Sequence, residues 1–473
     1  MVVENRSGGT LPGNTISGAE VDPGFEHEQV RLGTTLSVIT VAQILSAFGI
    51  QWYTIAHLGV GMDADALYAG ATLPQAVTVL LMEPLGFVLI PFLSSKGESE
   101  RNRLAWPLVS GIGVLSVVAT VVLIFLAPPT VRILAPGLTE FGMNLTVQLA
   151  QIQLLGVIGG ACGTVLVALS QARGQFVWPA LSLVLATLGG WGALVAGLDH
   201  WGVRFAAWTQ VGITTFSAVI LLPTLGRPTM AALREMPAVL YNVGVKMRPL
   251  VISVSYSRSG FVVDRFLASL LSPGSITILD FVLRIHSAMS RVLNHGVAAP
   301  VIPTMARFAN EGAWSAFNAL WRRRAWWMGC LSCGASLLLV LTAVGLYQTS
   351  VLEYWGIYGK VNPNDFVNIW GVLVGCSGVL CAAGVSHIFV NAFYAQGDMA
   401  LPAKIEIGTY TTGLIFKAFG LWWGGLVGIA AAISAYYLLT SVVLGVVLNR
   451  RVGRQLLVAT SVGVTGSVFE VRR

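Results

Sequence analysis

Two neighbouring apolar stretches of this chain carry charged side chains that a lipid environment accepts only at a cost. An ionisable side chain at bilayer depth costs at least ~2.5–3.5 kcal/mol on insertion scales, so such residues usually mark a functional site. The Asp and Arg residues of stretches 249–271 and 276–303 are Arg258, Asp264, Arg265, Asp280, Arg284 and Arg291. Their concentration predicts that the two stretches line a water-filled cavity.

One face of stretch 276–303 is polar if the stretch is helical. Positions 280, 284, 287, 291 and 295 are three or four residues apart, so their side chains form one helical stripe. The stripe contains Asp280, Arg284, Ser287, Arg291 and His295. Asp280 precedes Arg284 by four residues, which is the favoured order for an ion pair on a helix.

The cluster is open to two interpretations. In the first, each acid only neutralises the arginine beside it inside a helix bundle. In the second, the arginines bind phosphate, because a guanidinium group donates two parallel hydrogen bonds to phosphate and dehydrates more easily than an ammonium group. Arg258 and Arg291 have no acidic neighbour in the sequence, which favours the second interpretation. We therefore predict a substrate site formed by Arg284, Arg291, Arg258 and Asp280.

Acidic residues at membrane depth are also candidates for binding a coupling ion. The candidates are Asp264, Asp280 and Glu83. No other cofactor is expected.

We expect Lys417, near the end of an apolar stretch, to anchor its helix at the membrane surface. Cys330-x-x-Cys333 is not followed by a second ligand pair, so we expect small buried thiols and no metal site.

The elements that position these residues are predicted to be membrane-spanning helices. The chain has 473 residues, of which 55% are hydrophobic and 10% are charged, whereas soluble domains carry about 25% charged residues. About twelve apolar segments, each near the roughly 20 residues that cross a bilayer, recur along the chain. The fold class is therefore an all-α polytopic membrane protein. The continuous apolar runs argue against a β-barrel.

The distribution of lysine and arginine predicts the orientation. With the N-terminus in the cytoplasm, the outer links carry only Arg132, Arg204 and Lys360, and the other links and both tails carry the remaining lysines and arginines that lie outside the apolar stretches. This agrees with the positive-inside rule and places both termini in the cytoplasm. The same rule accounts for the net charge of +7 without nucleic acid as a partner.

Short matches at a nearly constant offset indicate that the chain is a duplication. ARGQFVWPA at 172–180 resembles AQGDMALPA at 395–403, and two weaker matches occur in the same order. Six segments separate the members of each pair, so the repeats are parallel and related by a pseudo-two-fold axis along the membrane normal. The predicted hinges are Gly174, Pro179, Gly397 and Pro402.

The predicted domain limits follow from the repeat. They are a disordered cytoplasmic tail (1–33), an N-terminal six-helix lobe (34–225), a cytoplasmic linker (226–248), a C-terminal six-helix lobe (249–448) and a basic cytoplasmic tail (449–473).

An ordered series of motifs over about residues 34–450 resembles the MviN/MurJ lipid II flippases of the MOP exporter superfamily. The motifs are GMDADALYAGATLP (61–74), FVLIP (87–91), APG (135–137), FLASLLSPGS (266–275) and FYAQGDMALP (393–402). The resemblance implies two lobes forming a V around a cationic cavity, in the inner membrane of a bacterium. Arg284 matches a functional arginine of the family's eighth helix, and Asp65 and Glu83 match acidic positions on its second helix, so the resemblance adds Asp65 and Glu83 to the predicted substrate site.

The resemblance implies a flippase, and not an enzyme, for a polyprenyl-diphosphate-linked sugar. We expect a monomeric carrier that works with the enzymes of cell-envelope synthesis. The family's first-helix arginines are absent here, since 41–57 holds none, and the chain has twelve segments without the family's two further helices. A lipid-linked oligosaccharide for polysaccharide export is therefore an alternative to lipid II.

Other function classes fit the sequence less well. A cation-coupled multidrug antiporter of the same superfamily needs an acidic site, whereas this one is predicted to be basic. A membrane polymerase or ligase usually places catalytic residues in a large outer loop, and the outer links here are short. A non-transporting scaffold relative remains a further alternative.

Overall fold

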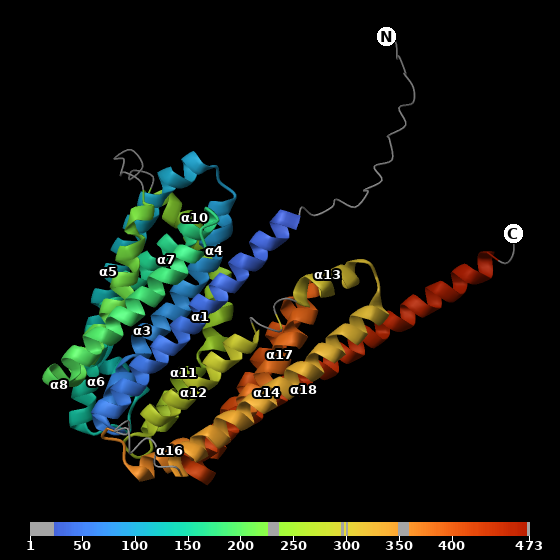
Figure 1. Cartoon of the computed structure of the whole chain (residues 1–473). Coiled ribbons are helices and arrows are strands. Elements are labelled where there is room, and N and C mark those ends of the chain that lie inside the picture. The colour runs from blue at the N-terminus through green and yellow to red at the C-terminus, as the bar shows by residue number, and fades with distance from the viewer. Residues whose placement is uncertain (1–22, 226–235, 295–297, 299–300, 349–358, 471–473) are drawn as a thin grey trace.

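The computed structural model describes residues 23–225, 236–294, 298, 301–348 and 359–470, and within these ranges the chain forms helices and no strand (Figure 1). The N-terminal lobe contains α1 (Pro23–Leu58), α2 (Met62–Gly70), α3 (Thr72–Val77), the π-helical turn η1 (Thr78–Met82), α4 (Glu83–Ser94), α5 (Glu98–Leu134), α6 (Glu140–Leu154), α7 (Gly156–Ala172), α8 (Val177–Leu221) and η2 (Leu222–Thr224). The rest of the chain contains α10 (Met236–Arg258), α11 (Gly260–Ser269), α12 (Ser275–Leu293), α13 (Ile302–Asn310), α14 (Trp314–Gln348), α16 (Pro363–Gly375), α17 (Ser377–Ala395) and α18 (Ala400–Glu470).

Eight helical stretches of the described residues are long and apolar enough to cross a membrane. Two of them, of 48 and 58 residues, are too long for one crossing, because a straight helix rises about 1.5 Å per residue and the hydrocarbon core is about 30 Å thick. Each is bent where glycine leaves the helical conformation, at Gly202 in α8 and at Gly424 and Gly425 in α18. Each therefore supplies two of the predicted segments.

The two charged stretches predicted at 249–271 and 276–303 are not among those eight stretches. They correspond to α10–α11 and to α12, which carry the charged cluster. With these two, the helices account for the twelve predicted segments. The all-helical polytopic fold is confirmed.

Three of the sequence-based expectations need correction. Helix α1 begins at Pro23, so the prediction of a disordered tail over 1–33 is wrong from Pro23 onward; residues 1–22 lie outside the described ranges. The predicted linker 226–248 is helical from Met236, and residues 226–235 are not described. Cys330 and Cys333 are exposed on α14 instead of buried.

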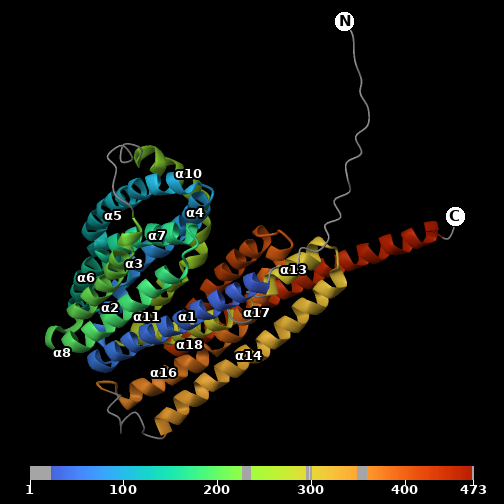
Figure 2. The same ribbon diagram turned by 45° about the horizontal axis from the view of Figure 1, so that its top comes forward.

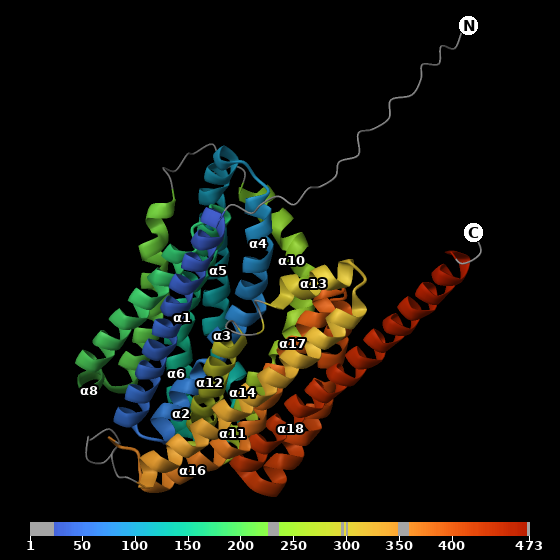
Figure 3. The same ribbon diagram turned by 45° about the vertical axis from the view of Figure 1, so that its right-hand side comes forward.

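The two lobes meet at one end of the molecule and diverge toward the other (Figures 1 and 3). We call the end at which α1 begins the proximal end and the opposite end the distal end. Two backbone contacts at the distal end are related by the duplication. A Cβ atom added to Gly137 would lie 1.9 Å from the carbonyl oxygen of Ser269, and one added to Gly359 would lie 2.0 Å from that of Ala56. Gly137 precedes α6 and touches the end of α11, whereas Gly359 precedes α16 and touches the end of α1. The two contacts therefore join equivalent elements of the two lobes.

Apolar packing explains why the distal end is closed. One buried cluster combines residues of both lobes, among them Ile55, Tyr68, Ile276, Phe281 and Ile433. A second cluster fills the proximal part of the C-terminal half and includes Met305, Phe317 and Phe393. Between helices inside a bilayer, close van der Waals packing of such side chains favours the contact.

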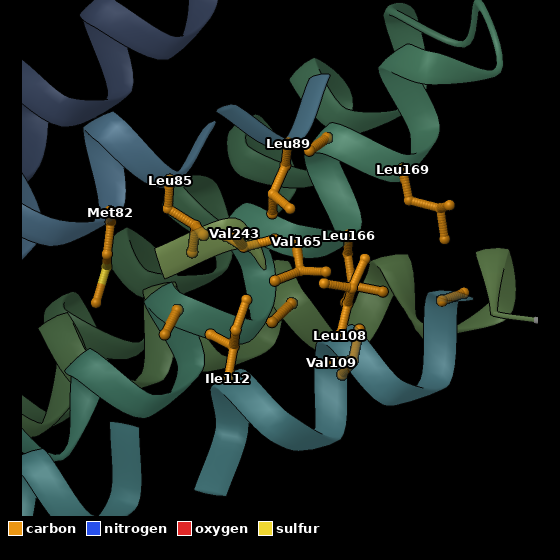
Figure 4. Packing of buried hydrophobic residues seen from close by; sticks show 14 of the residues in the cluster. Met82, Leu85, Leu89, Leu108, Val109, Ile112, Val165, Leu166, Leu169 and Val243 are labelled. Atoms are coloured by element: carbon orange, nitrogen blue, oxygen red, sulfur yellow. The ribbon is translucent and has the colours of Figure 1, made fainter. Parts of the chain in front are cut away.

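Helix α10 packs against the N-terminal lobe although it was predicted to belong to the linker and the C-terminal lobe. Val239 and Val243 of α10 lie in the same buried cluster as Leu89, Leu108 and Val165 (Figure 4). The view in Figure 2 shows α10 beside α4 and α5, and its last turn also contacts α18, where the hydroxyl oxygens of Tyr256 and Thr411 lie 2.6 Å apart. The chain thus crosses between lobes at the break between α10 and α11, not in the link before α10.

Candidate functional site

A cavity of about 430 Å³ lies between the lobes at the level of the charged cluster. From the N-terminal lobe it is lined by Gln75, Val79 and Glu83, which are four residues apart. Residues four apart lie on one face of a helix, and the stretch that joins these three includes the π-helical turn η1. From the other side, the lining includes Arg258, Asp264, Asp280, Arg284, Ser287, Arg291, Tyr410, Lys417 and Tyr436.

The predicted polar stripe of α12 faces this cavity. Asp280, Arg284, Ser287 and Arg291 all line it, as does Leu283. His295, the last residue of the predicted stripe, lies outside the described residues. His286, on the same helix, is 1% exposed and its ring Nδ1 lies 2.9 Å from the carbonyl oxygen of Val282, so it takes no part in the lining.

Asp280 is held between two arginines. Arg265 of α11 donates from Nη2 to Oδ1 at 2.6 Å, and Arg284 donates from Nε to Oδ2 at 2.7 Å. Each carboxylate oxygen therefore already faces a guanidinium group. Two guanidinium groups already compensate the single charge of Asp280, which argues against the predicted coupling ion at this carboxylate.

Arg265 also joins the two lobes. Its Nη1 donates to the hydroxyl of Thr72 at 3.1 Å, and its Nη2 donates to the amide oxygen of Gln75 at 2.9 Å. Both partners belong to α3 of the N-terminal lobe, and Arg265 itself is 5% exposed. A buried guanidinium group with so many partners serves as a fixed structural bridge and is not available to a substrate.

Arg284 combines an ion pair with access to the cavity. Its side chain remains 48% exposed while it contacts Asp280, and its guanidinium carbon lies 5.7 Å from the centre of the Tyr68 ring. A single bond from Nε to Asp280 leaves the two terminal nitrogens for another acceptor. Arg284 is thus both pre-oriented and able to donate to a ligand.

Arg258 and Arg291 add positive charge at the cavity wall. Both are exposed, and no acidic side chain of the described ranges forms an ion pair with either. The charged lining comprises four basic side chains (Arg258, Arg284, Arg291 and Lys417) and three acidic ones (Glu83, Asp264 and Asp280). The described lining therefore has a formal excess of one positive charge, and its free guanidinium groups lie along α12 and the end of α10.

Asp264 forms an ion pair that the sequence analysis did not anticipate. Its Oδ1 lies 2.7 Å from Nζ of Lys417 on α18. Lys417 is 2% exposed, so the expectation that it anchors its helix at the membrane surface is wrong. The sequence did offer a signal, because Lys417 lies well inside the apolar stretch 402–420 and a buried ammonium group requires a partner.

Asp65 lies apart from the cavity. Its Oδ2 accepts a hydrogen bond from the backbone N–H of Gly274 at 2.6 Å, and its Oδ1 accepts two from Thr277, at 2.8 Å from the N–H and 2.6 Å from the hydroxyl. The carboxylate of one lobe thus caps the first turn of α12 in the other, where unpaired N–H groups and the helix dipole favour an anion. This corrects the predicted substrate-binding role of Asp65 to that of a distal clasp between the lobes.

Glu83 is the acidic residue that does reach the cavity from the N-terminal lobe. It is half-buried at the start of α4, and the described residues include no ion-pair partner for it. No group of three or more His, Cys, Asp or Glu side chains in the described ranges has the arrangement of a metal site.

The four predicted hinge residues occupy equivalent proximal corners. Gly174 and Gly397 follow α7 and α17 with φ of 78° and 76°, a left-handed conformation that favours glycine. The same hydrogen bonds close both helices, from Gln175 to Ser170 and from Asp398 to Phe393. Pro179 and Pro402 are each the third residue of the next helix. The two corners therefore have the same backbone geometry, as expected from duplication.

Comparisons with known proteins agree with this architecture. A family described as "Lipid II flippase MurJ" matches residues 55–467. The lipid II flippase MurJ of Burkholderia cenocepacia is 24% identical over 389 residues, which cover 77% of this chain and 71% of that protein. A probable lipid II flippase MurJ of Synechocystis sp. is 23% identical over 457 residues, which cover 89% of this chain and 82% of that protein.

Two solved structures show the same fold. A lipid II flippase MurJ in an inward closed conformation has a TM-score of 0.70 at 14% identity, with 90% of this chain and 92% of that chain covered. An inward-facing multidrug resistance MATE family transporter of the MOP superfamily has a TM-score of 0.71 at 12% identity, with 89% and 98% covered. Since the family match spans most of the sequence and the fold agrees with it, this chain belongs to the lipid II flippase MurJ family.

Proposed function

We propose that this protein moves a polyprenyl-diphosphate-linked sugar from the inner to the outer leaflet of a bacterial plasma membrane by alternating access. The observation that carries the proposal is Arg284, which is fixed by Asp280 yet half exposed to the cavity between the lobes. Arg258 and Arg291 lie on the same wall. Guanidinium groups in this arrangement suit a diphosphate, whose charge cannot enter hydrocarbon without compensation.

The proposed cycle starts from the conformation described here. The lobes are closed at the distal end by the Asp65 clasp and the shared apolar cluster, and the cavity lies on the proximal side of them. We assign the proximal end to the cytoplasm, because the basic links and both termini belong to it under the positive-inside rule. The diphosphate enters there, binds the arginines, and leaves outward once the distal contacts separate.

The membrane potential supplies a driving force for this direction. An inside-negative potential favours outward movement of a net anion by about 2.3 kcal/mol per charge per 100 mV. The sequence contains no nucleotide-binding G-x-x-x-x-G-K-[ST] motif. We propose a monomeric carrier that receives its cargo from the enzymes that build lipid-linked sugars.

The substrate class can be tested with the purified chain in proteoliposomes. We expect movement of lipid II, or of another polyprenyl-diphosphate oligosaccharide, across the bilayer, and no accumulation of fluorescent organic cations. The opposite result would favour a cation antiporter, and activity toward neither would favour a scaffold. Complementation of a lipid II flippase depletion, compared with rescue of an exopolysaccharide exporter mutant, separates the two sugar classes.

A further inference from the structure

The carboxylate expected to hold a coupling ion already holds a cation that belongs to the chain. Asp264 of α11 and Lys417 of α18 form an ion pair of 2.7 Å, and their side chains are 11% and 2% exposed. Removing two charges from water costs several kcal/mol per ion, so the pair persists only because each charge compensates the other.

The surroundings of Lys417 form a site for one ammonium group. Its Nζ lies 5.7 Å from the ring centre of Tyr410 and 5.8 Å from that of Tyr436, and aromatic faces at this distance attract a cation. The Asp264 carboxylate and the two tyrosine rings therefore stabilise a positive charge at this position.

The cation next to Asp264 in the sequence does not provide an alternative partner. Arg265, its neighbour in sequence, directs its guanidinium group to Asp280, Thr72 and Gln75. Without Lys417, Asp264 would be a buried carboxylate that still borders the cavity, because both residues belong to the lining. A carboxylate in that position would attract a small cation from the water in the cavity.

We propose that Lys417 is a tethered counter-ion that takes the place of a coupling cation, so that transport requires neither Na⁺ nor K⁺. This inference rests on the proposed flippase function. Because the ammonium group cannot dissociate from the chain, the charge at Asp264 stays balanced whether the lobes face inward or outward. The driving force then acts on the anionic cargo alone.

The first test uses the wild-type protein in proteoliposomes. The potential is set with an anion gradient, and Na⁺ and K⁺ are replaced by N-methylglucamine. We expect the flipping rates in Na⁺, in K⁺ and in N-methylglucamine to agree within about twofold. A strict requirement for Na⁺ or K⁺ would overturn the proposal.

The second test reads cation binding without transport, and so separates this inference from the proposed function. Lys417→Ala removes Cγ, Cδ, Cε and Nζ, which are the atoms of n-propylammonium. We expect the unfolding temperature of purified Lys417→Ala to rise saturably, by at least about 3 °C, with n-propylammonium or Na⁺, because a ligand that binds only the folded state stabilises it. The wild type should show no such rise.

Three controls fix the interpretation. Lys404→Ala removes an exposed lysine from the same helix and should give no cation response. Lys417→Met fills the vacated volume and should give little response to n-propylammonium. The double variant Asp264→Asn/Lys417→Met removes both charges and should respond to neither cation. If folded Lys417→Ala showed no rise in unfolding temperature with either cation, Lys417 would not occupy a cation site and the proposal would fail. If Lys417→Ala does not fold, the flipping rate of the wild type without Na⁺ and K⁺ decides whether the proposal holds.

Discussion

Thr277 of α12 donates two hydrogen bonds to one carboxylate oxygen of Asp65, at 2.8 Å from its backbone N–H and 2.6 Å from its hydroxyl. The donor and the acceptor belong to different lobes, and all three bonds to Asp65 lie at the distal end. An outward-facing state must break them. Asp65 and Thr277 are therefore expected to set the balance between the two conformations.

Thr277→Val should favour opening of the distal end. The substitution removes one bond to a buried carboxylate, which is worth about 1.5–3 kcal/mol for charged partners. A cysteine at Ser269, which is 3% exposed beside the distal contact, should then react faster with an impermeant maleimide in a background without native cysteines. Thr412→Val, which removes a hydroxyl bonded within its own helix, is the matched control and should leave the labelling rate unchanged. Equal rates in Thr277→Val and the control would show that the clasp does not hold the lobes together.

Asp280→Asn should destabilise the protein strongly. It leaves Arg265 buried without a counter-charge, and breaking a buried pair in this way typically costs about 3–5 kcal/mol. The free energy of unfolding in detergent measures the effect. Glu100→Gln breaks the exposed Lys96–Glu100 pair and should cost no more than about 1 kcal/mol. A similar small cost for Asp280→Asn would contradict the structural role of Arg265.

Gly174→Ala and Gly397→Ala should each lower stability by about 1–2 kcal/mol. The cause is the left-handed backbone and not a clash, because a Cβ atom at either position meets no atom within 4 Å. Asparagine tolerates this conformation better, so Gly→Asn should cost less at both sites. Gly189→Ala, at a helical glycine with equally open space, should be neutral or slightly stabilising. If these glycines also act as hinges, the alanine variants should slow transport more than substrate binding.

Asp398 at the second proximal corner should titrate below the usual range of an aspartate. A hydrogen bond from Arg451 lowers the pKa of Asp398, with a further contribution from the N–H of Leu401. The stability from this pair is therefore present above the ordinary aspartate pKa, about 3.9, and is lost as the pH falls through the lowered value. The carboxyl ¹³C resonance of Asp398 reports the midpoint, which should return toward the ordinary value in Arg451→Met. An unchanged midpoint in that variant would exclude Arg451 as the cause.

The sequence was sufficient to predict the parts of the site that follow from local spacing. Asp280, Arg284 and Arg291 line one cavity because helical periodicity places residues three and four apart on one face. The two proximal corners could be predicted because the matching residues at 172–180 and 395–403 indicate the same backbone geometry. Positive φ at Gly174 and Gly397 agrees with that prediction.

The tertiary partners of these residues could not be predicted in the same way. The pairs Asp264–Lys417 and Asp65–Thr277 join helices far apart in the chain, and neither spacing nor composition specifies which helices meet. The start of α1 at Pro23 was missed for a different reason. A polar, Gly-rich composition favours disorder, but it does not locate where an adjoining apolar helix begins.

The central claim is that Arg284 binds the diphosphate of the cargo, and the flipping rate of an Arg284→Ala variant in proteoliposomes tests it most directly. We expect a loss of at least about tenfold, the equivalent of one lost charge-assisted hydrogen bond, with partial recovery in Arg284→Lys. Arg132→Ala, which removes an exposed arginine outside the cavity, should flip at the wild-type rate. Wild-type flipping by correctly folded Arg284→Ala would contradict the proposed diphosphate site.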